Sequence, residues 1–310
     1  MPTFPPEPIC SATTTPLPGA ALPAHRGGEA AFLRFWLLLS WLLLASVGAS
    51  LAQQPGYTLT CTGLVPPSSL QKRHCEIREL SLPAPPAGTP LTVDACPSGS
   101  ITVRGWNGTT VRVRARVVGR AATAAAAKAL AAAVRIGTPH HTLRASRANA
   151  STEGWEVSYE VLVPTRTSLT LLATTGGISL ENVQGNLRCE TTTGRLDLTG
   201  VGGDVRGKTT TGALVIRLTG PAWEGPGLDV STVTGDISWL LPATYSATVV
   251  ARTTRGRVTA ELPTTRKQVL ARSLTATLGK GGALLRASTT NGNVQVQQAG
   301  STPPPEPAAE

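Results

Sequence analysis

The sequence is poor in aromatic and charged side chains. Phe, Trp and Tyr make up 4% of the 310 residues, charged residues make up 15%, and there is one Met. It contains no run of five Lys or Arg residues, and few rings could stack on bases, so we expect no nucleic-acid partner. The formal net charge is nevertheless +10, carried mostly by single Arg residues between Val or Thr. This pattern favours attraction to an anionic envelope surface.

The sequence also has no apolar run of comfortable membrane-spanning length. Its longest, Phe35–Val47, follows Arg26 and Arg34 and precedes an A-x-A-like site at Ser50–Ala52. These features predict that residues 1–52 form an N-terminal extension and a secretory signal peptide, cleaved near Ala52, and hence a periplasmic, cell-surface or secreted protein. The Pro-rich stretch before it leaves two alternatives open. The start codon lies downstream, or the segment is an uncleaved anchor and the only link to a membrane.

Cysteine is scarce as well. Cys10 precedes the apolar run, and four cysteines remain in the part predicted to be exported. In an oxidising compartment four cysteines allow three pairings. Cys61, Cys75 and Cys96 cluster near the predicted mature N-terminus, so we expect one disulfide among them. Cys189 occupies an apolar repeat position, which is typical of a free buried thiol.

The main pattern in the rest of the sequence is an alternation of apolar and polar residues. Residues 53–100 are rich in Pro and Cys and predict a loop-rich lead-in pinned by a disulfide, whereas residues 299–310 predict a disordered tail. The β-repeat domain is expected over 101–298, with an Ala-rich helix at about 121–134. Period-two patterns predict the earlier strands over 98–106, 109–118, 141–148 and 154–164.

A nine-residue repeat, G-x-Φ-x-Φ with Φ apolar, starts at Thr174. Alternate copies begin TTG and V-x-G, so the full unit is 18 residues. We expect one short strand and one glycine corner in each copy, with coils stacked through backbone hydrogen bonds. The fold class is therefore all-β, as a parallel solenoid-like stack; the alternative is an antiparallel sandwich. The predicted corner glycines are Gly176, Gly185, Gly194, Gly203, Gly212 and, in looser copies, Gly235, Gly256 and Gly292.

An insert at 218–229 interrupts the period, and loops that project from such a stack often carry binding. Trp223 and Trp239, in or near this insert, are therefore candidate contact residues, although Trp239 could instead fill the core. Thr192 and Thr210 lie one coil apart and should stack as a hydroxyl ladder. That ladder could bind a polysaccharide, or the threonines could simply suit strand ends.

The stretch 202–209, GGDVRGKT, matches the P-loop pattern G-x-x-x-x-G-K-[ST]. A P-loop needs a helix that begins at the Lys-Thr pair, because its N-terminal amides bind phosphate. Here Gly203 is a repeat glycine, and the residues after Lys208 and Thr209 read as another strand. We interpret the match as coincidence and expect no nucleotide.

The order of elements is similar to that of the bacterial "putative adhesin" domain family of unknown function. Tyr159–Pro164, the Thr-Thr-Gly triplets and Val233–Ser238 carry the resemblance, which runs from about Ile101 to Val296. It implies an exported domain of the cell envelope built from Gly-rich β-strand repeats, and it supplies no catalytic residues.

These patterns predict a non-catalytic binding, adhesin-like or scaffold role, with an envelope polymer or a surface protein as partner. We expect no cofactor, and neither His74 beside Cys75 nor the neighbours His140 and His141 make a ready metal site, because adjacent strand residues face opposite ways. One alternative is a secreted carbohydrate-active enzyme, although Asp197 and Asp236 belong to different coils. A second is a structural or envelope-stress component without a fixed ligand.

Overall fold

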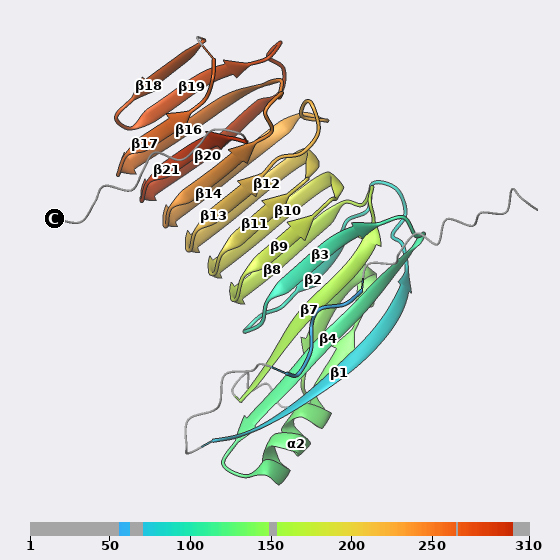
Figure 1. Ribbon diagram of the computed structural model, residues 1–310. Helices are drawn as coiled ribbons and strands as arrows, with labels where there is room; N and C mark the ends of the chain where they lie inside the picture. Colours follow the sequence, from blue (N-terminus) through green and yellow to red (C-terminus); the bar gives the residue numbers. More distant parts are fainter. Residues whose placement is uncertain (1–55, 63–70, 149–153, 265, 300–310) are drawn as a thin grey trace, which may run out of the picture. The chain divides into compact units, whose positions relative to one another are not determined.

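Two large β-sheets carry the fold, which confirms the all-β prediction. The computed structural model describes residues 56–62, 71–148, 154–264 and 266–299 (Figure 1), all of them in one compact unit. The predicted signal peptide, its cleavage site, Cys10 and residues 300–310 lie outside these residues. Within the described ranges, no helix combines the length and the apolar character that crossing a membrane requires.

The first sheet has ten strands and the second has eleven. Across the first sheet the strands are, in spatial order, β1 (Lys72–Pro83), β4 (Thr110–Ala121), β7 (Trp155–Pro164), β3 (Ile101–Trp106), β9 (Ile178–Glu181), β11 (Leu196–Thr199), β13 (Leu214–Arg217), β15 (Ile237–Leu241), β21 (Val294–Gln298) and β17 (Val258–Glu261). Across the second they are β18 (Lys267–Leu270), β19 (Ser273–Leu278), β16 (Ala247–Arg255), β20 (Leu284–Asn291), β14 (Gly227–Thr234), β12 (Gly202–Thr211), β10 (Gln184–Thr193), β8 (Leu169–Thr175), β2 (Leu91–Asp94), β6 (Thr142–Ser146) and β5 (Arg135–Gly137).

The four strands predicted before the repeats are present as β3, β4, β6 and β7. The Ala-rich helix is present as α2 (Ala124–Ala133), slightly shorter than expected, and a short 3₁₀ turn, η1, follows at Pro139–His141. Thr123 caps α2, since its Oγ1 accepts a hydrogen bond from the Ala126 amide at 3.2 Å. The helix lies close to β4, because a Cβ on Gly119 would be only 2.3 Å from the Ala127 carbonyl oxygen.

The lead-in is not loop-rich throughout, which corrects the sequence interpretation. β1 pairs along its whole length with β4, and β2 pairs in parallel with β8, Leu91 opposite Leu169. The Pro residues that flank both strands give the region the composition of a loop. The interiors of the strands nevertheless keep the backbone N–H groups that pair with the neighbouring strands. Residues 91–106 thus supply strands β2 and β3 next to the first repeat.

Strands one full repeat apart pair in parallel. In the second sheet Leu187 lies between Leu169 and Val205, and in the first sheet Leu196 lies between Ile178 and Leu214, so the register is 18 residues. The insert lengthens this register without breaking it. Val205 pairs with Leu228 and Leu214 pairs with Ile237, 23 residues apart, so the extra residues are absorbed at the corner. Antiparallel pairs join β1 to β4, β4 to β7, β5 to β6, β16 to β19 and β18 to β19.

The last coils do not follow one another in chain order (Figure 1). β20 lies between β14 and β16, and β21 lies between β15 and β17. Gly292 therefore stands between Gly235 and Gly256 in space, although it comes after both in the sequence.

A column with no room for side chains is formed by six of the predicted corner glycines: Gly176, Gly194, Gly212, Gly235, Gly292 and Gly256. The prediction is wrong for Gly185 and Gly203, which lie inside β10 and β12 and approach each other there. A Cβ on Gly194 would be 2.1 Å from the Gly176 carbonyl oxygen, and one on Gly212 would be 2.0 Å from that of Gly194. Beside the column runs a row of buried threonines that bond to these carbonyls. Thr209 Oγ1 donates to the Gly194 oxygen at 3.0 Å, and Thr191, Thr232, Thr253 and Thr289 donate in the same way to Gly176, Gly212, Gly292 and Gly235.

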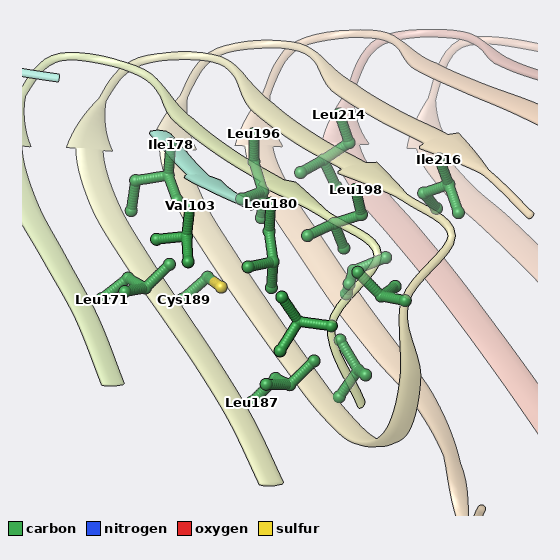
Figure 2. Packing of buried hydrophobic residues seen from close by; sticks show 14 of the residues in the cluster. Val103, Leu171, Ile178, Leu180, Leu187, Cys189, Leu196, Leu198, Leu214 and Ile216 are labelled. Atoms are coloured by element: carbon green, nitrogen blue, oxygen red, sulfur yellow. The ribbon is translucent and has the colours of Figure 1, made fainter. Parts of the chain in front are cut away.

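The Φ positions of both sheets meet in one apolar core (Figure 2). Leu187 and Cys189 from β10 lie near Leu180 and Leu198 from the facing sheet, and all four are fully buried. Burial raises the pKa of the Cys189 thiol to about 12.

Residues 56–62, here called the strap, cross the outside of the first sheet. Glu160, 1% exposed, accepts hydrogen bonds from the Thr58 amide (2.9 Å to each carboxylate oxygen) and from the Leu59 amide (2.6 Å). Arg104 Nη1 lies 2.8 Å from the same carboxylate. A buried carboxylate is tolerated here because both of its oxygens have charged or amide donors.

A disulfide and a cation–π contact also hold the strap. Cys61 and Cys75 are bonded, which ties the strap to β1, whereas Cys96 and Cys189 are free. The Arg114 guanidinium lies 4.3 Å from the centre of the Tyr57 ring.

Candidate ligand-binding face

The two tryptophans do not form an exposed contact surface, which corrects their assignment as candidate binding residues. Trp223 is 8% exposed, and its Nε1 donates to the Gly203 carbonyl oxygen at 3.1 Å, so the insert folds back onto a corner glycine. Trp239 is 1% exposed and fills the core, because it lies at a Φ position of β15, opposite Ile216 and Val296.

The two threonines are exposed and in register. Thr191 pairs with Thr209, so the next residues, Thr192 and Thr210, lie side by side on the outside of the second sheet. The same row continues along the neighbouring strands through Val233, Thr290 and Thr254, all exposed.

Two further rows on this surface contain most of its charge. We define the charged face as the outward side chains of β10, β12, β14, β20 and β16, which are neighbours in the sheet (Figure 1). One row reads Arg188, Arg206, Asp229, Arg286, and the next reads Glu190, Lys208, Ser231, Ser288, Arg252. Successive members are about 4.8 Å apart, the spacing of paired strands. A regular lattice of charges and hydroxyls results.

A depression of about 580 Å³, the first depression, hollows this face over β10, β12, β14 and β20. Arg188, Arg206 and Arg286 line it together with Lys208. Two of these cations have acidic partners on their own strands: Arg188 lies 2.9 Å from Glu190, and Arg206 lies 3.3 Å from Asp204. Arg188 and Arg206 are 61% and 69% exposed, so these pairs are weak and can be replaced by a ligand.

A second depression, of about 430 Å³, adjoins the first and shares Lys208 and Ser231 with it. Arg252 and Arg272 line it, with hydroxyls of Ser and Thr residues from β12, β14, β16, β19 and β20. No acidic side chain is among its lining residues. The two depressions adjoin through these shared residues and together carry an excess of positive charge.

The carboxylates considered for catalysis are held by neighbouring groups. Asp197 lies 2.9 Å from Arg195 and 3.8 Å from Arg217. Asp236 Oδ1 accepts a hydrogen bond from the Asn293 amide at 2.7 Å, which links two coils. In the part of the chain that the structure describes, no group of three or more His, Cys, Asp or Glu side chains is placed to hold a metal ion.

The P-loop-like stretch is a strand. Residues 202–211 form β12, with Lys208 on the outside and Thr209 buried against the Gly194 carbonyl, and β13 follows. Adjacent residues of a strand face opposite ways. The helix N-terminus that a P-loop needs is therefore replaced here by a second strand.

The arginines of the charged face are candidate site residues that sequence reasoning missed. Arg188 and Arg206 occupy the same place in two successive 18-residue units, between the two Φ positions, and Arg286 has the equivalent place in β20. A nine-residue alignment puts Asp197 between Arg188 and Arg206, whereas an 18-residue alignment puts the two arginines next to each other in one column. Arg286 could be added to this row only once the order of the strands in the sheet was known.

Comparisons with known proteins give likenesses at low identity. A putative cell adhesion protein from Clostridium sporogenes aligns at 11% identity over 73% of this chain and 100% of its own, with a TM-score of 0.35. A putative adhesin from Bacteroides fragilis aligns at 10% over 73% and 97%, with a TM-score of 0.36, and one from Parabacteroides distasonis at 7% over 72% and 97%, with a TM-score of 0.32. These names agree with the resemblance found in the sequence.

No family model matches this chain. No curated protein matches it either.

Proposed function

We propose that this protein is an exported, non-catalytic, adhesin-like module that binds an acidic surface polysaccharide on its charged face. The observation that carries the proposal is the in-register row of Arg188, Arg206 and Arg286 beside the row that contains Lys208 and Arg252. A polymer that runs across the strands meets a new cation or hydroxyl at each strand, so many weak contacts add along its length.

The shape and chemistry of the face support a polymer over a small molecule. Both depressions are open and are lined by charged and hydroxyl side chains, whereas small-molecule sites are mostly enclosed. Exposed arginines recognise carboxylates and other oxyanions through paired N–H donors. The Cys61–Cys75 disulfide supports export, because such bonds persist in oxidising compartments.

The proposal is tested with dextrans that share one backbone. Carboxymethyl dextran should bind the wild-type protein and neutral dextran should not, as measured by surface plasmon resonance. The variant Arg188→Gln, Arg206→Gln, Arg286→Gln should bind about tenfold more weakly, since it removes three contacts of about 0.5 kcal/mol each. The matched control, Arg195→Gln, Arg217→Gln, Arg257→Gln, removes the same charge outside the charged face and should bind within about twofold of wild type at 150 mM salt.

Two results would contradict the proposal. Equal losses in the two triple variants would mean that binding follows net charge and not the face. Release of reducing ends from the polymer, abolished by Asp197→Asn or Asp236→Asn, would favour the carbohydrate-active enzyme instead.

A further inference from the structure

The second depression has a feature that polymer binding in general does not require. Four outward residues on neighbouring strands form one row in the order Lys208, Ser231, Ser288, Arg252. Two long cationic side chains thus flank two short ones. The backbones of Lys208 and Arg252 are three strand spacings apart, about 14 Å, so the serines form the floor of a trough between them.

The cations around this trough have no acidic partners. Lys208, Arg252 and Arg272 form no ion pair in the described part of the chain, and no acidic side chain lines the depression. Arg188 and Arg206 in the first depression differ, because both are paired with acids on their own strands. Three unpaired cations around one small volume attract an anion more strongly than paired ones do.

The hydroxyls divide into two sets, of which one faces the trough. Thr209, Thr232, Thr253 and Thr289 donate to glycine carbonyls and are committed to the corners. Ser231 and Ser288 are half-buried, and within the described residues neither hydroxyl has a hydrogen-bond partner. Arg272 is fixed at the rim, because its carbonyl accepts from the Thr253 amide at 3.0 Å and the next residue, Ser273, pairs with Arg252.

We propose that this trough binds a sulfate or phosphate ester group on the polymer, an inference that rests on the proposed function. Such a group presents three terminal oxygens in different directions. The donors also come from different directions: the serine hydroxyls from the floor, Lys208 from one side, and Arg252 and Arg272 from the other. A carboxylate has two oxygens in one plane and is satisfied by a single guanidinium fork, so it leaves the remaining donors unused.

The test compares dextran sulfate, phosphorylated dextran and carboxymethyl dextran of matched length and charge density, with Kd measured at 150 mM salt. Wild-type protein should bind at least one of the ester-bearing polymers about tenfold more tightly than carboxymethyl dextran. The variant Arg252→Gln, Arg272→Gln should lose this preference, because its affinity for the ester-bearing polymer falls by a larger factor than its affinity for carboxymethyl dextran. The control Arg255→Gln, Arg257→Gln removes two exposed arginines outside both depressions and should keep the preference.

The outcomes separate the two proposals. Equal affinities of wild type for all three polymers, or an equal loss on all three in the Arg252 and Arg272 variant, would overturn the ester site and leave the charged face standing. Failure of wild type to bind any of the three would overturn both. The polymer whose affinity falls further in the variant identifies the group as sulfate or phosphate. All four substituted arginines are exposed, and thermal unfolding of each variant verifies that the fold is retained.

Discussion

At the scale of single residues, the corner positions need glycine for two reasons: a positive φ and the close approach of a neighbouring backbone carbonyl. Gly212 has a φ of +156°, and a Cβ there would be 2.0 Å from the Gly194 carbonyl oxygen, a backbone atom that cannot move aside cheaply. We expect Gly212→Ala to lower the free energy of unfolding by about 2–3 kcal/mol. Gly137→Ala is the control: its Cβ would meet only the Pro139 Cδ at 3.5 Å, so a change within about 0.5 kcal/mol is expected in urea denaturation.

The buried Cys189 thiol makes stability depend on alkaline pH. Its folded-state pKa of about 12 is above the ordinary value of 9.0, because burial disfavours the thiolate. The unfolded chain therefore loses this proton first, and the thiol's contribution to stability is complete below pH 9 and is lost as the pH rises towards 12. We expect the free energy of unfolding to fall more steeply over this range in wild type than in Cys189→Ala. If the free energies of unfolding of the two proteins fell in parallel with pH, water would have access to the thiol in the folded state.

At the scale of elements, the strap depends on one carboxylate. Glu160→Gln replaces an oxygen that accepts an amide proton with an NH₂ group that cannot, and it leaves Arg104 without its buried counter-ion. Breaking a buried ion pair typically costs about 3–5 kcal/mol. We expect destabilisation of that order and faster hydrogen exchange at the Thr58 and Leu59 amides.

A matched control for the strap is Glu181→Gln. Glu181 lies 3.3 Å from the same Arg104 but is 39% exposed, so its loss should cost less than about 1 kcal/mol and leave the strap amides protected. Equal effects of the two substitutions would mean that Arg104, and not the strap, sets the stability of this region.

Elements with a strong local signal could be predicted from the sequence. The alternation in 109–118, the Ala density of 121–134 and the TTG triplets each fix a local conformation that packing did not override. β1 and β2 were missed because their flanking Pro residues resemble a loop. The placement of β20 between β14 and β16 was also missed, because strand order depends on long-range pairing that no local pattern records.

The candidate site was harder to predict than the fold for a related reason. Successive nine-residue copies form strands in opposite sheets. The strand between Arg188 and Arg206 in the sequence, β11, therefore belongs to the other sheet. Only the 18-residue register joins these two arginines, and only the strand order adds Arg252 and Arg286. Trp223 and Trp239 were predicted as contact residues because they lie in or near the insert, yet large apolar side chains are most stable where water is excluded.

At the scale of the whole molecule, the charge of +10 acts on an acidic polymer before any contact forms. Screening limits this attraction, since the Debye length is about 30 Å in 10 mM salt and about 8 Å at 150 mM. At low salt a polymer responds to charge on all sides of the protein, whereas at 150 mM it responds to the arginines that it touches. The triple variants of the charged face and of the control arginines remove the same charge.

We therefore expect similar association rates with carboxymethyl dextran for the two variants at 10 mM salt, both below wild type. At 150 mM the face variant should dissociate about tenfold faster, while the control matches wild type. A difference between the variants that disappears at 150 mM would mean that long-range attraction alone accounts for binding.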